Sequence, residues 1–538
     1  MNPIFKKFIS KPILILITIN IIIGLFIFRN FGTSWDEPLF YSYGDALGYA
    51  YSPHEWFSGH FDLYNSYGAS GDDHKNRGPA YLFLAREFVY GLKALGSEST
   101  SAWHLVNFLF FQFGIYFLYR ISKRWMNESS AFFTAIFFSL QPLLWGHAFI
   151  NPKDPPFLTF FLASMCFGFE MVDAIAQNSQ DKTKKILLAS FFLGIATSIR
   201  VLGPFAGLLI VLYSISKSYK SNLLVFASQW FKTFFPSILQ YGFFTIIIMF
   251  ATWPFLWENP FKNFVNVFMF MSDNPTHLPV LFGGETYAAG ELPRRYFPFM
   301  LSTTLTEPTI PLFIIGVVLG FWKLFKSKSE TRRDQLVSLS LMFAWFAILV
   351  AYIIIRKPAM YDGIRHFLFV LPPVFIFAGL AFEAITDFFS SRPGFLPTWL
   401  RAGLGLLLIL PGINGIVRLH PYEYTYYNSF IGGTDGAFRN YETEFWLTCY
   451  KDAVEQLDEQ ITTPVNLYVK REAYIAAPYA TDNITVIDLR GAMNQVRSGD
   501  YVLVNTRTNE DQSTFKDAPT VIEIKRGDAT FCIVRQIP

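Results

Sequence analysis

The sequence predicts a polytopic α-helical membrane protein with a small α/β domain after its last membrane helix. Of its 538 residues, 52% are hydrophobic, 19% aromatic and only 16% charged, whereas a soluble protein carries about a quarter charged residues. Long apolar runs recur along the chain and stop near His420, where charged residues, Asn and Thr return. Because a helix inside a membrane needs no polar face, this composition is typical of a multi-span protein.

Eleven apolar runs predict about 11 transmembrane helices. They cover residues 12–28, 102–119, 131–150, 157–172, 186–199, 202–215, 234–253, 310–325, 336–355, 367–385 and 400–417. The fifth and sixth runs are separated only by Arg200 and its neighbours, so they could also form one broken helix. The first run follows Lys6, Lys7 and Lys11, as in a signal peptide, but no small-x-small cleavage site follows it, which favours a retained span.

Loop charges orient these helices. Lys and Arg are enriched in cytoplasmic loops, and the Lys-rich N-terminus and the Lys326-Ser327-Lys328 loop therefore face inside. This leaves loops 30–100 and 254–308 outside, with the C-terminus, and we expect a bacterial inner-membrane protein with a periplasmic tail. Segments 81–90 and 261–271 suit amphipathic helices on the membrane surface, although loop helices packed on the bundle would give the same pattern. Residues 81–95 could also dip into the membrane.

The polar tail predicts a second domain, dividing the chain into residues 1–418 and 419–538. Residues 453–461 have a helical amphipathic pattern, and β-branched runs at 465–469, 484–487, 501–504 and 520–524 predict strands. A final run at 530–534 could pair with the strand before it. Cys449 and Cys532 both lie in this domain, so they could form a disulfide if the domain faces an oxidising compartment.

Two adjacent carboxylates, Asp36 and Glu37, follow the first span directly. Near the lipid interface a carboxylate is partly desolvated, which raises its proton affinity and suits it to act as a base. The alternative is structural, since acids are also favoured at helix N-termini.

Further charges belong to the same predicted face. Lys153 and Asp154 lie in a Pro-bounded loop, Arg200 separates two apolar runs, and Arg365 precedes the tenth span. Cations stabilise a phosphate and a carboxylate can deprotonate a hydroxyl, so this set indicates a site that handles an anionic lipid headgroup and a polar acceptor. Lys153 could instead snorkel to headgroups, but a charge such as Arg200 within an apolar hairpin usually faces a cavity.

Several short motifs carry a family resemblance. They are Trp35-Asp36-Glu37, Asn151-Pro152-Lys153-Asp154, the run from Tyr361-Asp362-Gly363-Ile364-Arg365-His366 to Pro373, and the Tyr-rich segment from His420 to Asn428 followed by Gly432-Gly433. With the many spans and the external tail, they resemble the GT-C superfamily of integral-membrane glycosyltransferases, and within it the protein O-mannosyltransferase and ArnT-type group (glycosyltransferase family 39-like).

The resemblance implies a polyprenyl-phosphate-sugar donor, inversion at the anomeric carbon and Asp36 as the base. Glu37 and Asp154 would orient substrate or a metal. Lys153, Arg200 and Arg365 would hold the departing lipid phosphate, and Tyr361 and His366 are further candidate substrate contacts. The chain lacks the Trp-Trp-Asp motif of oligosaccharyltransferases, and loop 254–308 is too short for the β-trefoil of many protein O-mannosyltransferases, so a large preassembled glycan and a protein acceptor are both disfavoured.

The sequence therefore favours an enzyme that moves one sugar to an extracytoplasmic lipid-linked glycan or envelope polymer. The acids Asp36, Glu37 and Asp154 could bind one divalent ion, and the small net charge of +3 speaks against nucleic-acid binding. A transporter or flippase of a lipid-linked saccharide is the alternative, although it predicts internal repeats and midplane charges. A membrane scaffold displaying its C-terminal domain is a third.

Overall fold

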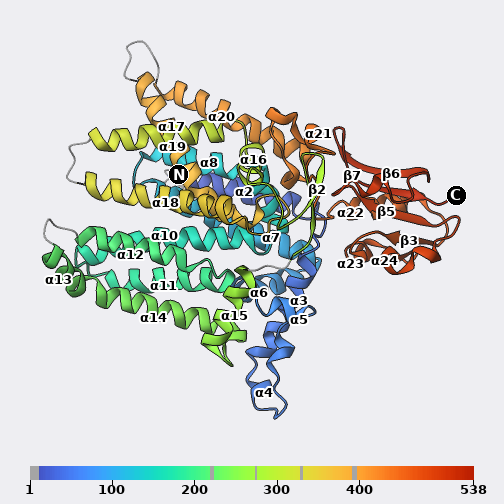
Figure 1. Ribbon diagram of the computed structural model, residues 1–538, viewed down its shortest axis with the longest axis horizontal. Coiled ribbons are helices and arrows are strands. Elements are labelled where there is room, and N and C mark those ends of the chain that lie inside the picture. Colours follow the sequence, from blue (N-terminus) through green and yellow to red (C-terminus); the bar gives the residue numbers. More distant parts are fainter. Residues whose placement is uncertain (1–10, 219–222, 273–275, 327–330, 391–396) are drawn as a thin grey trace.

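The computed structural model describes residues 11–218, 223–272, 276–326, 331–390 and 397–538. Long helices lie side by side in a bundle, and a mixed β-sheet lies beyond one end of it (Figure 1). Lys6, Lys7 and Lys328, on which the predicted orientation partly rests, lie outside the described residues.

The bundle contains every predicted span as a helix. Its helices are α2 (Pro12–Ile27), α7 (Ser99–Ser122), α8 (Glu128–Ser139), α9 (Pro142–Ile150), α10 (Asp154–Ala176), α11 (Lys182–Ile199), α12 (Pro204–Ser218), α14 (Phe235–Ala251), α17 (Thr309–Lys326), α18 (Arg332–Arg356), α19 (Leu371–Ser390) and α20 (Pro397–Leu419). The third run is split into α8 and α9, bent by 63°, because Pro142 cannot donate a helical hydrogen bond. The fifth and sixth runs are separate helices, α11 and α12.

Helix length and composition support fewer crossings than eleven. Among the described residues, six helices are long and apolar enough to cross a membrane, or seven if α8 and α9 form one bent span, and α2, α12 and α14 are shorter apolar helices. Helix α11 is in neither group, and three lysines lie in its first turn. The chain is a multi-pass membrane protein in which several helices are short.

The two long loops contain structure of their own. The first holds α3 (Glu37–Ala50), α4 (Pro53–Trp56), α5 (Gly71–His74) and α6 (Ala80–Ala94); α13 (Leu223–Thr233) precedes α14; the second holds α15 (Pro260–Ser272), the hairpin β1 (Pro279–Phe282) and β2 (Glu285–Ala288), and α16 (Tyr296–Thr303). Helices α6 and α15 confirm the two amphipathic segments as helices. Phe261 and Val265 of α15 are exposed, as expected for a helix that lies on a membrane surface. The location of α15 on a membrane stays a prediction.

The C-terminal sheet has the strand order β4-β3-β5-β7-β6. The strands are β3 (Val465–Val469), β4 (Ile484–Asp488), β5 (Tyr501–Asn505), β6 (Thr520–Arg526) and β7 (Ala529–Gln536), accompanied by α21 (Gly433–Ala437), α22 (Tyr450–Gln460), α23 (Ala473–Ala476) and α24 (Leu489–Ala492). Strands β3, β4 and β5 are parallel, whereas β7 pairs antiparallel with β5 and β6. The predicted strands and the final hairpin are confirmed. Cys449 and Cys532 are buried free thiols.

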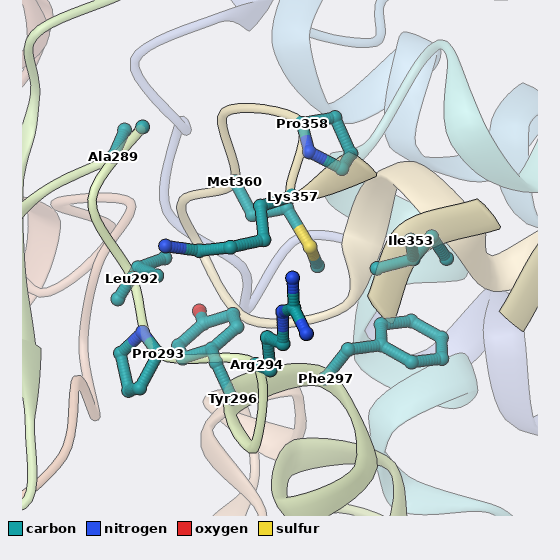
Figure 2. Close-up of a pocket in the computed structure, with 11 residues that line it drawn as sticks. Ala289, Leu292, Pro293, Arg294, Tyr296, Phe297, Ile353, Lys357, Pro358 and Met360 are labelled. Atoms are coloured by element: carbon teal, nitrogen blue, oxygen red, sulfur yellow. The ribbon is translucent and has the colours of Figure 1, made fainter. Parts of the chain in front are cut away.

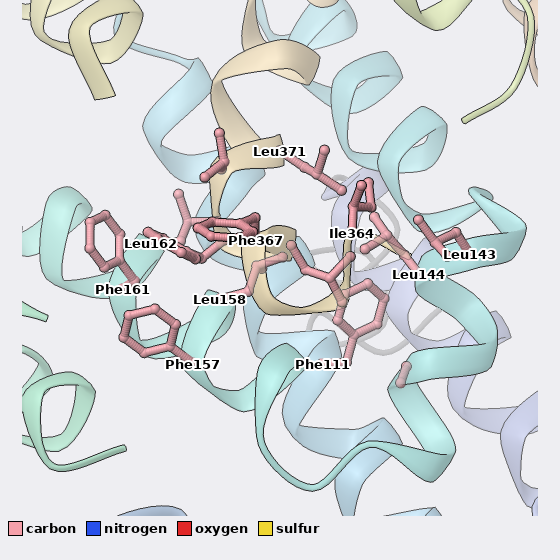
Figure 3. Close-up of a cluster of buried hydrophobic side chains, with 14 of the residues drawn as sticks. Phe111, Leu143, Leu144, Phe157, Leu158, Phe161, Leu162, Ile364, Phe367 and Leu371 are labelled. Carbon is pink, nitrogen blue, oxygen red and sulfur yellow. The ribbon is translucent and has the colours of Figure 1, made fainter. Parts of the chain in front are cut away.

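An apolar cluster lies inside the helical bundle, next to the residues that flank Arg365. Phe111 of α7, Leu144 of α9 and Leu158 of α10 pack there with Ile364 and Phe367 (Figure 3). Ile364 and Phe367 flank Arg365 in sequence. Their burial in this cluster therefore fixes the loop from which Arg365 projects.

Candidate active site

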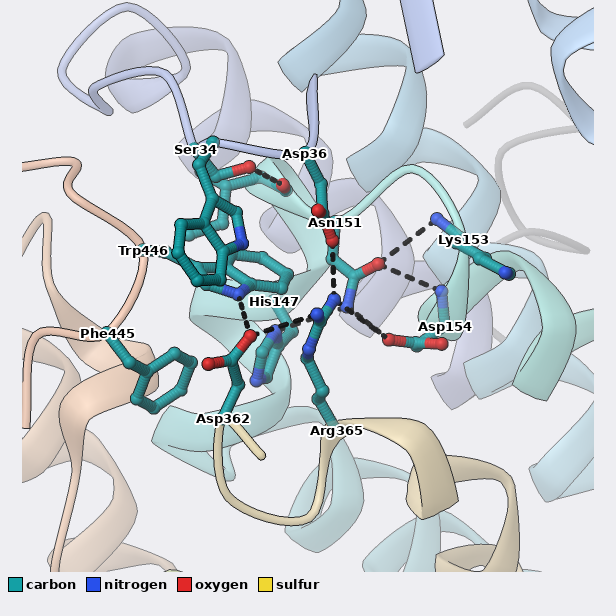
Figure 4. A network of polar contacts seen from close by, with 12 residues as sticks. Ser34, Asp36, His147, Asn151, Lys153, Asp154, Asp362, Arg365, Phe445 and Trp446 are labelled. Atoms are coloured by element: carbon teal, nitrogen blue, oxygen red, sulfur yellow. Dashed lines mark hydrogen bonds and ion pairs between the residues drawn. The ribbon is translucent and has the colours of Figure 1, made fainter. Parts of the chain in front are cut away.

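Arg365 is the centre of a polar cluster at the sheet-facing end of the bundle (Figure 4). Its Nη1 donates to Asp36 Oδ2 at 2.6 Å, its Nη2 lies 2.9 Å from Asp362 Oδ2, and Asp154 Oδ2 is 4.0 Å from Nη1. The three acids come from three separate segments of the chain. A guanidinium has five donors in a fixed fork, so one arginine can join several carboxylates.

The conformation of residues 361–366 aims Arg365 into this cluster. Asp362 and Gly363 have φ angles of 57° and 66°, a left-handed turn that glycine adopts without strain. Arg365 follows this turn and begins a short 3-10 helix, Arg365–Val370. Its Cζ lies 5.1 Å from the ring centre of Tyr361 and 4.9 Å from that of Trp446, so aromatic faces stabilise the buried cation.

Asp36 is the exposed member of the cluster. Its side chain keeps 28% of its accessible surface, and the residue directly precedes α3, although its side chain makes no capping hydrogen bond. Burial would raise the pKa of Asp36, but the charges of Arg365 and Arg77 outweigh burial and hold it below the ordinary value. Asp36 is therefore ionised at neutral pH and accessible to a ligand.

Asp154 is buried and fully bonded. It is the first residue of α10, where a negative charge is favoured. Its carboxylate pairs with Arg200 and accepts a hydrogen bond from Asn151 Nδ2 at 2.9 Å, and its amide donates to Asn151 Oδ1 at 2.9 Å. Arg200 ends α11. The pair joins α10 to α11 beside Arg365.

Lys153 is a cation without a carboxylate. The residue is only 8% exposed, its Nζ lies 5.7 Å from the ring centre of Phe40, and among the described residues no acid approaches Nζ within 4.0 Å. Burial lowers the pKa of Lys153 well below its ordinary value, and the charges of Arg77 and Arg200 lower it further. An anion bound beside Nζ would relieve this cost.

Arg77 and His74, which sequence reasoning missed, also reach the cluster. Arg77 pairs with Asp73 at 2.8 Å and exerts its charge on Asp36 and Lys153. Burial lowers the pKa of His74 to about 4, with Arg77 contributing. Gly78 permits this approach: a Cβ there would lie 1.2 Å from the backbone oxygen of Ser198. The charged run 72–77 in an aromatic loop was the available signal.

Glu37 does not join Asp36. Its carboxylate is fully buried, accepts from the Ser34 amide at 2.6 Å and from the Tyr41 hydroxyl, and lies 2.8 Å from His104 Nε2. Consecutive residues at the start of a helix point about 100° apart, which separates the two acids. Glu37 thus fixes the loop that carries Asp36.

Tyr361 and His366 lie at the cluster. Tyr361 packs under Arg365, and its ring meets the half-buried His366 edge to face at 4.7 Å. With Lys153, Arg200 and Arg365, the predicted substrate contacts therefore gather in one place.

The donor set does not suit the predicted divalent ion. Asp36 and Asp154 are each paired with an arginine, and Glu37 faces away from them. Within the described ranges no group of three His, Cys, Asp or Glu side chains could hold a metal.

A small pocket lies beside the same loop, between α16 and the end of α18 (Figure 2). Tyr296, Phe297 and Ile353 line it, with Arg294 and Lys357 at its mouth. It is separate from the polar cluster, and nothing assigns a ligand to it.

Comparison with known proteins places the fold. No protein-family model matches the sequence, and no curated protein is significantly similar to it. The apo oligosaccharyltransferase of Archaeoglobus fulgidus matches with a TM-score of 0.51 at 11% identity, over 94% of this chain and 70% of that one. The chain has the GT-C fold.

Two further solved structures are similar. The A. fulgidus oligosaccharyltransferase AglB, in complex with an inhibitory peptide and a dolichol-phosphate, matches with a TM-score of 0.50 at 11% identity, over 95% of this chain and 71% of that one. ArnT from Cupriavidus metallidurans, bound to undecaprenyl phosphate, gives a TM-score of 0.47 at 11% identity and 97% coverage of both chains. Through the two A. fulgidus matches, the chain is similar in fold to GT-C membrane glycosyltransferases.

Proposed function

We propose that this chain is a glycosyltransferase that moves one sugar from a polyprenyl phosphate of the undecaprenyl or dolichyl type to an extracytoplasmic acceptor. The observation that carries the proposal is that one polar cluster contains an accessible, ionised carboxylate, Asp36, and a buried lysine without a carboxylate of the described residues within 4.0 Å, Lys153. The dolichol-phosphate bound to AglB supports the ligand class. The quoted motifs favour the ArnT and O-mannosyltransferase group within GT-C.

In the proposed reaction Asp36 is the general base. The acceptor hydroxyl oxygen attacks the anomeric carbon from the face opposite the phosphate, the bond to the phosphate oxygen breaks with its electron pair, and the hydroxyl proton passes to Asp36. Because the pKa of Asp36 is low, the transfer is favourable only as the new C–O bond forms and acidifies the hydroxyl. Arg365 orients the carboxylate through their 2.6 Å bond.

The departing lipid phosphate is stabilised by the cations of the polar cluster. Lys153 is the leading phosphate ligand because its ammonium does not have to break an ion pair with a protein carboxylate before it binds. Arg77 adds positive charge to the same site. Arg200 and Arg365 contribute through space while they remain paired with Asp154 and Asp36. Charge-assisted donors aimed at a leaving group are worth more in a dry site than in water.

We also propose the arrangement in the cell. Residues 1–418 form the membrane domain and residues 419–538 an extracytoplasmic domain, in a bacterial inner membrane. The acceptor is a lipid-linked glycan or envelope polymer, with a protein acceptor less favoured. Tyr361 and His366, at the cluster edge, are proposed to contact the sugar.

The test is turnover of purified protein with radiolabelled polyprenyl-phosphate sugars and a membrane extract as acceptor. Asp36→Asn keeps the shape but removes the base, and we expect about a 10²–10⁴-fold loss of kcat with donor binding retained. Asp45→Asn is the matched control, because Asp45 lies on the same helix and bonds to Tyr90 instead. Equal turnover in Asp36→Asn would refute the assignment. Lipid movement between vesicle leaflets without any turnover would favour the flippase.

A further inference from the structure

A buried arginine of the C-terminal sheet reaches the candidate site. Arg507 follows β5 and is 1% exposed. Its Nη2 lies 2.8 Å from Asp362 Oδ1, and its Nε donates to Glu442 Oε1 at 2.9 Å. Its Cζ stands 4.6 Å from the ring centre of Trp35, next to Asp36 in sequence. A cation this deeply buried needs ionised partners.

Asp362 links this arginine to the site. The residue is fully buried, and its two oxygens face different cations: Oδ1 meets Arg507, while Oδ2 meets Arg365 at 2.9 Å and accepts from Trp446 Nε1 at 2.9 Å (Figure 4). Arg365 in turn holds Asp36. Positive and negative groups therefore alternate from the C-terminal sheet to the proposed base.

The loop that carries Asp36 is held by the same domain. The Trp35 amide donates to the Trp446 carbonyl at 3.2 Å, and the Tyr474 hydroxyl donates to the Trp35 carbonyl at 2.9 Å. The Thr33 amide donates to the Tyr479 hydroxyl at 2.9 Å. A Cβ on Gly32 would lie 2.1 Å from the Thr448 carbonyl oxygen, so only glycine allows this contact.

From these contacts we infer that the C-terminal domain is part of the active site, and that Arg507 is a positioning residue that sets Asp36 through Asp362 and Arg365. The inference rests on the proposed function and gives the C-terminal domain its role in it.

The charge chain predicts a specific defect. Without Arg507, Asp362 loses the partner of Oδ1, and its contact with Arg365 through Oδ2 is the ion pair that remains to it among the described residues, so Arg365 shifts from Asp36 toward Asp362. The base is then misplaced and turnover falls. Lys153 and Arg77 form no ion pair with Asp362 among the described residues, since Arg77 pairs with Asp73 and Lys153 lies beside Phe40, so lipid-phosphate binding is unchanged.

The test compares kcat and the Kd for undecaprenyl phosphate in full-length variants. We expect Arg507→Met to lower kcat at least tenfold and to leave Kd within twofold. Adding Asp362→Asn to Arg507→Met removes the carboxylate that competes with Asp36 for Arg365, leaves Asp36 as the nearest partner of Arg365, and should recover kcat at least fivefold. A simple tether between domains predicts no such rescue, since the second change removes another contact.

Arg535→Met is the matched control, because Arg535 is a buried arginine at the other end of the sheet and donates to the Thr514 carbonyl. It should keep the wild-type kcat. If Arg507→Met does not fold, Arg507→Lys, which retains the charge, should keep Kd and lose part of kcat. The inference would be overturned if Arg507→Met kept the wild-type kcat while Asp36→Asn was inactive, or if Asp362→Asn gave no rescue. Either result would leave the proposed function standing. No turnover in the wild type would refute the proposed function and the inference with it.

Discussion

Replacing Lys153 by methionine tests whether Lys153 binds a ligand or only supports the fold. A hydrogen bond to a charged group contributes about 1.5–3 kcal/mol, and each 1.4 kcal/mol is tenfold in affinity. Loss of the contact between Nζ and a lipid phosphate should therefore weaken binding by about 10- to 150-fold. No carboxylate of the described residues lies within 4.0 Å of Nζ, so the folded protein loses no ion pair.

Stability should move in the other direction. Methionine has a similar length and packs well against an aromatic ring such as Phe40, and it removes the cost of a desolvated ammonium. We therefore expect an unchanged or higher Tm together with the weaker binding.

The assay is a titration of the variant in lipid nanodiscs with undecaprenyl phosphate, beside a thermal melt. Lys357→Met is the control, because Lys357 is an exposed lysine outside the cluster and its loss should change neither quantity. A lower Tm with an unchanged Kd for Lys153→Met would show that Lys153 only supports the fold, and would refute the reasoning.

Three further outcomes are expected. The pKa of Lys153 is lowered in the free protein and a bound phosphate raises it, so phosphate binding takes up a proton. The affinity for lipid phosphate should therefore fall as pH rises. Lys153→Arg, which stays charged, should flatten that fall in titrations at several pH values. Asp154→Asn leaves the half-buried Arg200 without its carboxylate and should cost about 3 kcal/mol in a denaturant melt, with most of it recovered by adding Arg200→Gln. Equal midpoints would rule out the pair as a stabilising contact. Gly78→Ala places a Cβ 1.2 Å from a backbone oxygen of α11, so Arg77 must shift and lipid-phosphate affinity should drop at least fivefold, whereas Gly91→Ala, with open space around it, should leave affinity unchanged.

Most of the fold could be predicted from local pattern. Apolar runs became helices because a backbone in an apolar environment must satisfy its hydrogen bonds within the segment. The β-branched runs after His420 became strands, and the last two paired as a hairpin. The bend between α8 and α9 was not predicted, although Pro142 marks it.

The site was predictable only in part. Asp36, Lys153, Asp154, Arg200 and Arg365 were recognised because charges are rare beside apolar runs. The direction of the Glu37 side chain was not predicted, because the rotation of about 100° between consecutive helical residues turns it away from Asp36. Loop 71–79 has no periodic pattern, so nothing local aims Arg77 at the site. Arg507 depends on contacts between residues far apart in sequence, which composition does not encode.

The separation of these contacts along the chain constrains biogenesis. Arg365 and Asp36, which form the central ion pair, are 329 residues apart, and the Arg507 contact forms still later in synthesis. The spans enter the membrane in order, so the Asp36 loop emerges early and waits for its partners through most of translation. Chain termination or proteolysis before Arg507 leaves a product with an incomplete charge chain. The charge chain is therefore complete only after the ribosome has passed Arg507, late in the synthesis of the protein.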